Sequence, residues 1–211
     1  MAGLVLYDHP VSSNALRARF LLAVLDLPYE RRRVPFVEPR PAEYLALNPF
    51  GRIPTLVDEE LVLAESNTVL RYLAHREERY DLYPLDPRQR ARVDWAMDAW
   101  STIVRPSLFA LEAVTIFRDG PKDDGGTAEG ADPEAVAATL PRIEATLAAY
   151  ETFAADNGTV LGTFTIADCS VAPVLWRTLR LPIDFTPYPK LARLRDAIAA
   201  NPAFEAAGPV G

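Results

Sequence analysis

The segment from residue 48 to residue 56, Asn-Pro-Phe-Gly-Arg-Ile-Pro-Thr-Leu, restricts the fold of this chain more than any other. Its Pro54 directly precedes a short strand-like run, residues 55–57. Proline has no backbone N–H, so a strand accepts it only at the first position or on an edge. An Ile53–Pro54 bond can be cis at modest cost, and a cis bond would turn the Ile53 N–H and C=O away from the sheet, where an extended peptide could pair with them. A trans loop proline is the alternative that the local sequence leaves open.

The pair Glu65-Ser66 is a second signal, because it stands just ahead of apolar residues at helical spacing and so predicts a helix start. Free N–H groups at a helix start attract anions. A ligand carboxylate could accept hydrogen bonds from the Ser66 hydroxyl and backbone N–H, while Glu65 could accept one from a ligand amine. Simple capping of the helix by Ser66 is the alternative.

The composition of the 211 residues allows one large or two small domains, and 49% hydrophobic residues are enough for a core. A net charge of −7 gives no electrostatic reason to expect nucleic acid as a partner, and the basic run at residues 31–33 is interpreted as the solvated face of a strand. The single cysteine, Cys169, excludes an intrachain disulfide and a Cys-pair metal site. Two well-separated histidines, His9 and His75, do not predict a metal site either.

The N-terminal residues lack the features of a secretory signal, and no apolar run approaches the length of a membrane span. A lone cysteine also fits a reducing compartment. We therefore expect a cytoplasmic protein with no membrane partner.

Hydrophobic patterning divides the chain into an α/β part and an all-helical part. The predicted strands cover residues 4–7, 29–34, 55–57 and 61–63, and the predicted helices cover residues 14–25, 65–78, 88–117, 133–155, 165–179 and 188–200. Pro106 should kink or end the third helix, and Pro141 should interrupt the fourth. Asp168 has the spacing of a capping box, so we interpret it as structural and the adjacent Cys169 as a core thiol. We expect domains over residues 1–80 and 88–211, joined by a proline-containing linker over 81–87.

Taken together, the Asn-Pro-x-Gly-x-x-Pro-x-Leu block and the Glu-Ser-Asn run resemble the glutathione transferase family, over essentially the whole chain. The resemblance implies a thioredoxin-like βαβ-α-ββα domain followed by a helical bundle, a cis proline and a homodimer. It also implies that Ile53, Pro54, Glu65 and Ser66 bind glutathione, with Glu65 and Ser66 at its γ-glutamyl end. Arg52 could reach the glycine carboxylate of glutathione, or could be a solvated loop arginine.

The chemistry would lie in the loop after the first strand, which holds Ser12 and Ser13 at the start of a helix. A free thiol has a pKa near 8.5, and one charge-assisted hydrogen bond of about 1.5–3 kcal/mol lowers such a pKa by about one to two units. The stretch resembles serine-type transferases of the theta and zeta kind, in which Ser12 aligns with the activating hydroxyl and Arg17 with a basic helix residue. Simple helix capping is compatible with that role, and Ser13 stays open as the alternative. Asn14 stands where zeta enzymes carry cysteine, which weakens the case for a maleylacetoacetate isomerase.

The resemblance predicts an enzyme that activates glutathione with a serine hydroxyl and adds the thiolate to a hydrophobic electrophile, with no metal. The alternatives are a non-catalytic glutathione-binding or protein-interaction module and a glutathione-dependent isomerase; peroxidase and dehalogenase activities also stay open. The electrophile would sit between the domains. Candidate contacts on the helical side are Trp95, Trp100, Ile103, Leu108 and Phe109.

Overall fold

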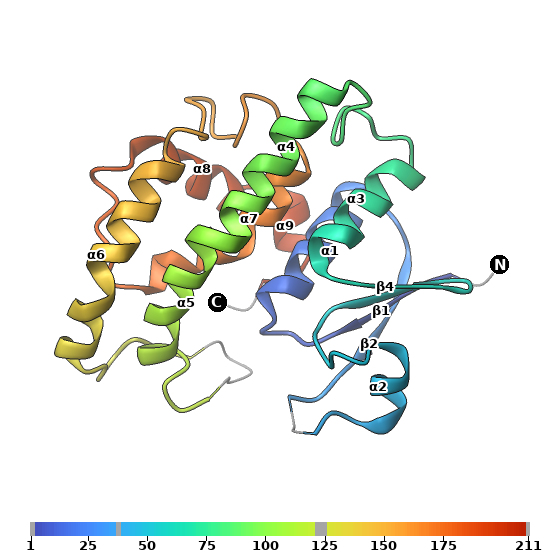
Figure 1. Cartoon of the computed structure of the whole chain (residues 1–211), viewed down its shortest axis with the longest axis horizontal. Helices are drawn as coiled ribbons and strands as arrows, with labels where there is room; N and C mark the ends of the chain where they lie inside the picture. Colours follow the sequence, from blue (N-terminus) through green and yellow to red (C-terminus); the bar gives the residue numbers. More distant parts are fainter. Residues whose placement is uncertain (1–2, 37–38, 121–125, 210–211) are drawn as a thin grey trace.

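The computed structural model describes residues 3–36, 39–120 and 126–209, which form an α/β domain packed against a helical domain (Figure 1). The α/β domain contains, in chain order, β1 (Leu4–Asp8), α1 (Ser13–Val24), β2 (Tyr29–Arg33), α2 (Ala42–Leu47), β3 (Thr55–Asp58), β4 (Leu61–Ala64) and α3 (Ser66–Arg76). The sheet has the order β2-β1-β3-β4. β1 is parallel to β2 and antiparallel to β3, and β3 and β4 form an antiparallel hairpin. This is the predicted thioredoxin-like topology.

Helix α1 is buried on nearly all sides, and its sequence accordingly shows no clear division into a polar and an apolar face. It packs against α3 within its own domain and against α7 and α9 of the helical domain. Phe20, for example, is fully buried and meets Phe204 at 5.1 Å between ring centroids. The two domains therefore share one hydrophobic core, and the N-terminus of α1 lies beside the helical domain (Figure 1).

The helical domain follows a connection that ends at Asp86, whose side chain caps the next helix. Its helices are α4 (Pro87–Ala99), α5 (Arg105–Val114), α6 (Pro133–Tyr150), α7 (Ile166–Arg177), α8 (Pro189–Ala199) and α9 (Pro202–Ala206), with a 3₁₀ turn at Thr178–Arg180. Within the described part of the chain, no helix is both long enough and apolar enough to cross a membrane.

The helix predicted over residues 88–117 is distorted just ahead of Pro106 but continues through it, and it ends at Val114. A π-helical turn, Trp100–Val104, separates α4 from α5, and Pro106 lies in the first turn of α5, where its missing N–H costs least. Pro141 does not interrupt α6, contrary to the expectation: the helix runs through it from residue 133 to residue 150. Pro141 is exposed, so water can satisfy the carbonyl group that proline leaves without a partner.

Asp168 caps α7, as its spacing predicted. One carboxylate oxygen accepts a hydrogen bond from the Thr165 N–H and the other accepts one from the Val160 N–H, each at 2.8 Å. Burial nevertheless raises the pKa of Asp168 to about 6. The adjacent Cys169 is a fully buried free thiol, also as predicted. The short helix α9 was not predicted, because its few residues carry no periodic signal and tertiary packing of Phe204 holds it in place.

Candidate active site

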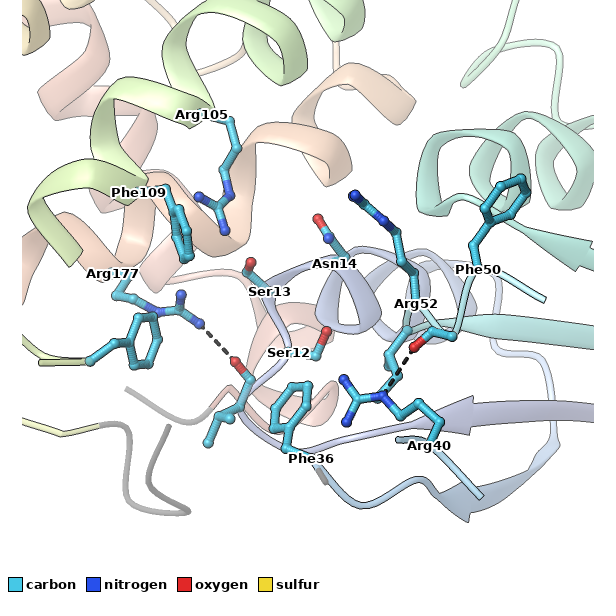
Figure 2. Close-up of a pocket in the computed structure, with 14 residues that line it drawn as sticks. Ser12, Ser13, Asn14, Phe36, Arg40, Phe50, Arg52, Arg105, Phe109 and Arg177 are labelled. Carbon is cyan, nitrogen blue, oxygen red and sulfur yellow. Dashed lines mark hydrogen bonds between the residues drawn. The ribbon is translucent and has the colours of Figure 1, made fainter. Parts of the chain in front are cut away.

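A cavity of about 560 Å³ lies between the two domains at the N-terminus of α1 (Figure 2). Its lining residues are Val11, Ser12, Ser13, Asn14, Phe36, Arg40, Phe50, Gly51, Arg52, Ile53, Arg105, Phe109, Phe117 and Arg177. A second cavity of about 430 Å³ shares Asn14, Arg52, Arg105 and Phe109 with the first and continues to Glu65 and Ser66. The two cavities together form one groove along the domain interface.

Ser12 is the N-cap of α1, and its side chain lies in the larger cavity. Its Oγ accepts a hydrogen bond from the Ala15 N–H at 3.2 Å, and its own backbone N–H donates to the His9 carbonyl at 3.0 Å. The oxygen is thus fixed by the helix that it caps. Because the capping bond uses a lone pair, the hydroxyl proton is left to donate to a ligand at the positive end of the helix.

Ser13 and Asn14 continue the same wall of the cavity. Ser13 is buried and Asn14 is exposed, and the labelled side chains of both reach into the space between the domains (Figure 2). Both predicted catalytic hydroxyls, Ser12 and Ser13, are therefore brought to one place.

Two arginines hold the loop that carries these serines. Arg177, at the end of α7, donates a hydrogen bond to the Val11 carbonyl at 3.1 Å. Arg19, in α1, donates to the Pro10 carbonyl at 3.1 Å and lies 3.7 Å from the fully buried Asp8 carboxylate. One support comes from the α/β domain and the other from the helical domain, so the position of the loop depends on both.

The segment from residue 48 to residue 56 forms the neighbouring wall, and the Ile53–Pro54 bond is cis. The buried Asn48 side chain donates to the Arg52 carbonyl at 2.7 Å and to the Thr55 hydroxyl at 3.1 Å, so it holds the segment from behind. None of the loop backbone hydrogen bonds within the described part of the chain uses Ile53. The Ile53 backbone is therefore available to a ligand, while Pro54 lies one residue beyond the cavity lining.

Gly51 permits the turn that precedes this wall. Its φ of +63° lies in the left-handed region, and an added Cβ would come within 3.1 Å of the Arg40 side chain. Arg40 in turn donates to the Gly51 carbonyl at 3.0 Å.

Glu65 and Ser66 lie at the far end of the groove, where α3 begins. Glu65 has a φ of +66°, a strained conformation for a non-glycine residue that is typical of ligand sites. Ser66 is buried, and its Oγ accepts a hydrogen bond from Arg17 Nη1 at 3.2 Å. The next residue, Asn67, bonds Ser101 at 3.0 Å and Ser170 at 2.8 Å, which fixes the start of α3 against the helical domain.

Arg17 is a buried cation that lines the smaller cavity. Burial, followed by the nearby Arg105 charge, lowers the pKa of the Arg17 guanidinium to about 9, so it stays charged at neutral pH. Its Nε and Nη2 have no hydrogen-bond partner among the described residues. A buried cation with free donors is costly unless an anion pairs with it, so this end of the groove is suited to a carboxylate.

The helical wall contains a buried carboxylate between two arginines. Glu112 is fully buried, 3.2 Å from Arg177 Nη1 and 3.6 Å from Arg105 Nη1. Arg105 lies over the Phe109 ring and Arg177 over the Phe117 ring, at 4.8 and 5.2 Å from the ring centroids. Burial lowers the pKa of Arg105; Glu112 opposes this effect and Arg177 adds to it. Two positive charges thus share one negative charge beside the cavity.

Most of the predicted ligand-binding residues line this groove: Ser12, Ser13, Arg52 and Ile53 in the larger cavity, and Arg52, Glu65 and Ser66 in the smaller one. Of the candidates for the electrophile, only Phe109 lines either of these cavities. Trp100 and Leu108 are fully buried in the core, because their stripe faces the inside of the helical domain. Ile103 is exposed, and Trp95 packs against Phe153 at 4.8 Å in a separate surface cavity.

Sequence reasoning missed Arg105, Glu112 and Arg177. Arg177 ends helix α7 after the apolar run of residues 171–176, and a charge in such a position is the one signal that could have indicated a buried ion pair. Among the described residues, no three His, Cys, Asp or Glu side chains come together as potential metal ligands.

The fold and the interdomain groove define a thioredoxin-like domain joined to a helical domain. Residues 2–75 match the model of the glutathione S-transferase N-terminal domain, and residues 133–198 match the model of its C-terminal domain. The maleylacetoacetate isomerase of Pseudomonas aeruginosa is 31% identical over 97% of this chain and 95% of its own length. Glutathione S-transferase GstB of Escherichia coli is 29% identical over 95% of each chain. A theta-class glutathione S-transferase from Xanthomonas axonopodis pv. citri, solved with glutathione bound, superposes with a TM-score of 0.83 at 26% identity, covering 98% of this chain and 97% of that one.

This chain therefore belongs to the glutathione S-transferase family.

Proposed function

We propose that this protein binds glutathione along the interdomain groove, activates its thiol with Ser12, and transfers the thiolate to an electrophile. The observation that carries the proposal is the Ser12 hydroxyl, which is held at the N-terminus of α1 inside the cavity with its proton free to donate. The structure of a related theta-class enzyme with glutathione bound supports the choice of co-substrate.

The γ-glutamyl end of glutathione would occupy the smaller cavity. Its carboxylate can accept hydrogen bonds from Ser66 and from the unpartnered donors of Arg17. Its ammonium group can donate to Glu65, which lines the same cavity. This arrangement matches each charged group of that end with a group of opposite charge.

The middle of the tripeptide would pair with the Ile53 backbone, and the glycine carboxylate would lie near Arg52. Both residues line the larger cavity, and the Ile53–Pro54 bond beside them is cis. An extended peptide held at both ends then places its cysteine near Ser12.

Ser12 would lower the pKa of the bound thiol by donating a hydrogen bond to the sulfur. A charge-assisted hydrogen bond of about 1.5–3 kcal/mol, together with the dipole of α1, favours the thiolate by about one to two pKa units. The S–C bond then forms as the electrophile accepts the electron pair of the thiolate, while the thiol proton has already passed to solvent.

A glutathione-dependent isomerase is the second candidate. It is supported by the 31% identity to the maleylacetoacetate isomerase of Pseudomonas aeruginosa, and it would use the same activated thiol. Release of glutathione unchanged, in place of a stable conjugate, would identify it.

The test is the thiolate absorbance of the glutathione complex as a function of pH. We expect a midpoint at least one unit below that of free glutathione, lost in Ser12→Ala and kept in Ser13→Ala. Because Ser12 also caps α1, the affinity of each variant for S-methylglutathione, which has no ionisable thiol, shows whether the site is intact. An unshifted midpoint with tight binding would favour the non-catalytic binding module. A shift lost in Ser13→Ala alone would assign the role to Ser13.

We also propose a domain division at residues 1–80, 81–87 and 88–211, a cytoplasmic location and a homodimer formed through α3 and α4. The end of α3 at Arg76 and the start of α4 at Pro87 support the division. Sedimentation equilibrium would test the dimer.

A further inference from the structure

We propose that the electrophile is an acid: a planar apolar molecule whose carboxylate binds Arg105 while its ring lies against Phe109 and Phe117. This inference rests on the proposed function and names the class of the second substrate. The sequence predicts a hydrophobic electrophile, whereas the electrophile proposed from the structure carries a negative charge.

The charge of the larger cavity is the first observation. Among the residues that the structure describes, its lining includes Arg40, Arg52, Arg105 and Arg177 and no acidic residue. Figure 2 shows two of these arginines, Arg40 and Arg52, on one side of the cavity and the other two on the opposite side, with the serines between. Glutathione needs a cation for the glycine carboxylate on the first side, beside Ile53. The second pair faces the space beyond the sulfur, which is where the other substrate must approach.

Arg105 has the free donors that an anion requires. It comes within 3.6 Å of Glu112, but within residues 3–36, 39–120 and 126–209 its guanidinium forms no hydrogen bond. The side chain is 18% exposed, so this guanidinium is largely removed from water while it still faces the cavity. Arg177, by contrast, already donates to Glu112 and to the Val11 carbonyl. Arg105 is therefore the better ligand of the two.

The single negative charge of Glu112 does not balance the two positive charges of Arg105 and Arg177. The single buried carboxylate lies between two guanidinium groups, and the closer of them is Arg177. An incoming carboxylate would provide the second negative charge and could bind the planar fork of Arg105 in a bidentate manner.

Phe109 and Phe117 supply the apolar part of the subsite. Each ring has an arginine over it, and both rings line the same cavity. Aromatic walls beside a guanidinium select a flat molecule that carries an acid at its edge.

Nucleophilic aromatic substitution provides a balanced test reaction. The thiolate of glutathione forms an S–C bond at the carbon that bears chlorine in 4-chloro-3,5-dinitrobenzoate, and the C–Cl bond breaks with its electron pair leaving as chloride. The methyl ester of the same compound has the same ring and leaving group but no charge. Rates for each are divided by the uncatalysed rate with glutathione, because the ester is intrinsically more reactive.

We expect the normalised kcat/KM of the wild type to be about tenfold or more higher for the acid than for the ester. A preference of this size corresponds to one charge-assisted hydrogen bond at a partly buried site. Arg105→Met should lose that preference, because the normalised kcat/KM for the acid should fall about tenfold more than that for the ester. Arg105→Lys should retain part of it, which guards against a folding defect in the first variant. Arg142→Met, an exposed arginine on α6, serves as the matched control and should change neither rate.

Calorimetry with the two synthetic glutathione conjugates gives a second readout that needs no turnover. The acid conjugate should bind the wild type about tenfold more tightly than the ester conjugate, and Arg105→Met should remove the difference. Equal affinities, or a preference that survives Arg105→Met, would overturn the proposal. If neither conjugate nor S-methylglutathione binds, the proposed function itself fails.

Discussion

The two walls of the interdomain groove are built in different ways. The wall from the thioredoxin-like domain presents small hydroxyls and backbone groups, such as Ser12 and Ile53, beside the side chains of Arg40 and Arg52. Hydrogen bonds between near neighbours in the sequence hold much of it in place. The helical wall presents long side chains, Arg105, Phe109 and Arg177, around a fully buried carboxylate. Backbone groups can recognise only a ligand of fixed shape, whereas long side chains can differ from protein to protein without altering the fold. The first wall thus suits an invariant co-substrate, and the second suits a variable one.

The largest expected effect is the loss of stability when Glu112, on the helical wall, is removed. We expect Glu112→Ala to lower the free energy of unfolding by about 3–5 kcal/mol, because it leaves two guanidinium groups beside each other without their shared anion. Urea denaturation monitored by circular dichroism measures the change. Glu144→Gln, an exposed acid on α6, should change stability by less than about 0.5 kcal/mol. Equal effects of the two variants would refute the structural importance of the buried network.

The far end of α7, the helix that carries Arg177, should respond to pH through Asp168. Burial raises the pKa of Asp168 from 3.8 to about 6, so its contribution to stability is fully present below about pH 4 and is lost as the pH rises through about 6. Relative to Asp168→Asn, the free energy of unfolding of the wild type should fall by about 3 kcal/mol between about pH 4 and pH 7. A gap between the two proteins that stays constant over this range would contradict the assignment.

The thioredoxin-like wall should lose affinity for glutathione when Ser66 is changed. Ser66→Ala removes a hydroxyl that Arg17 bonds, and we expect S-methylglutathione to bind about 10- to 100-fold more weakly, which corresponds to a hydrogen bond with a charged group. Thr68→Ala removes an exposed hydroxyl from the same helix and should leave the affinity unchanged. If calorimetry finds Ser66→Ala and Thr68→Ala alike, the γ-glutamyl end does not bind there.

The smallest expected effect separates the two aromatic candidates on the helical wall. Phe109→Ala should raise the KM for an aromatic electrophile about fivefold, because a half-exposed ring contributes about 1 kcal/mol of apolar contact. Trp95→Ala should leave KM unchanged, since Trp95 lies in a different surface cavity. Initial rates at several electrophile concentrations give the KM of each variant. A larger increase of KM in Trp95→Ala than in Phe109→Ala would place the electrophile in the other cavity, beside Trp95.

The same contrast explains which parts of the site the sequence could predict. Ser12, Ile53 and Glu65-Ser66 belong to local motifs of a few neighbouring residues, so patterning and resemblance could single them out, and all of them line the groove. Glu112 and Arg177 act through a contact between residues 65 positions apart, and no local pattern records it. The stripe containing Trp100 and Leu108 was recognised as apolar, but periodicity alone does not tell a core face from a cavity face.

The hydrogen bond from Arg177 to the Val11 carbonyl joins residues 166 positions apart. During synthesis, a ribosome releases the loop with Ser12 long before it has made α7. The Ser12 loop therefore acquires the support of Arg177 only when nearly the whole chain has left the ribosome. A truncated product that contains the complete thioredoxin-like domain would lack this support, so the order of translation itself postpones completion of the groove until α7 exists.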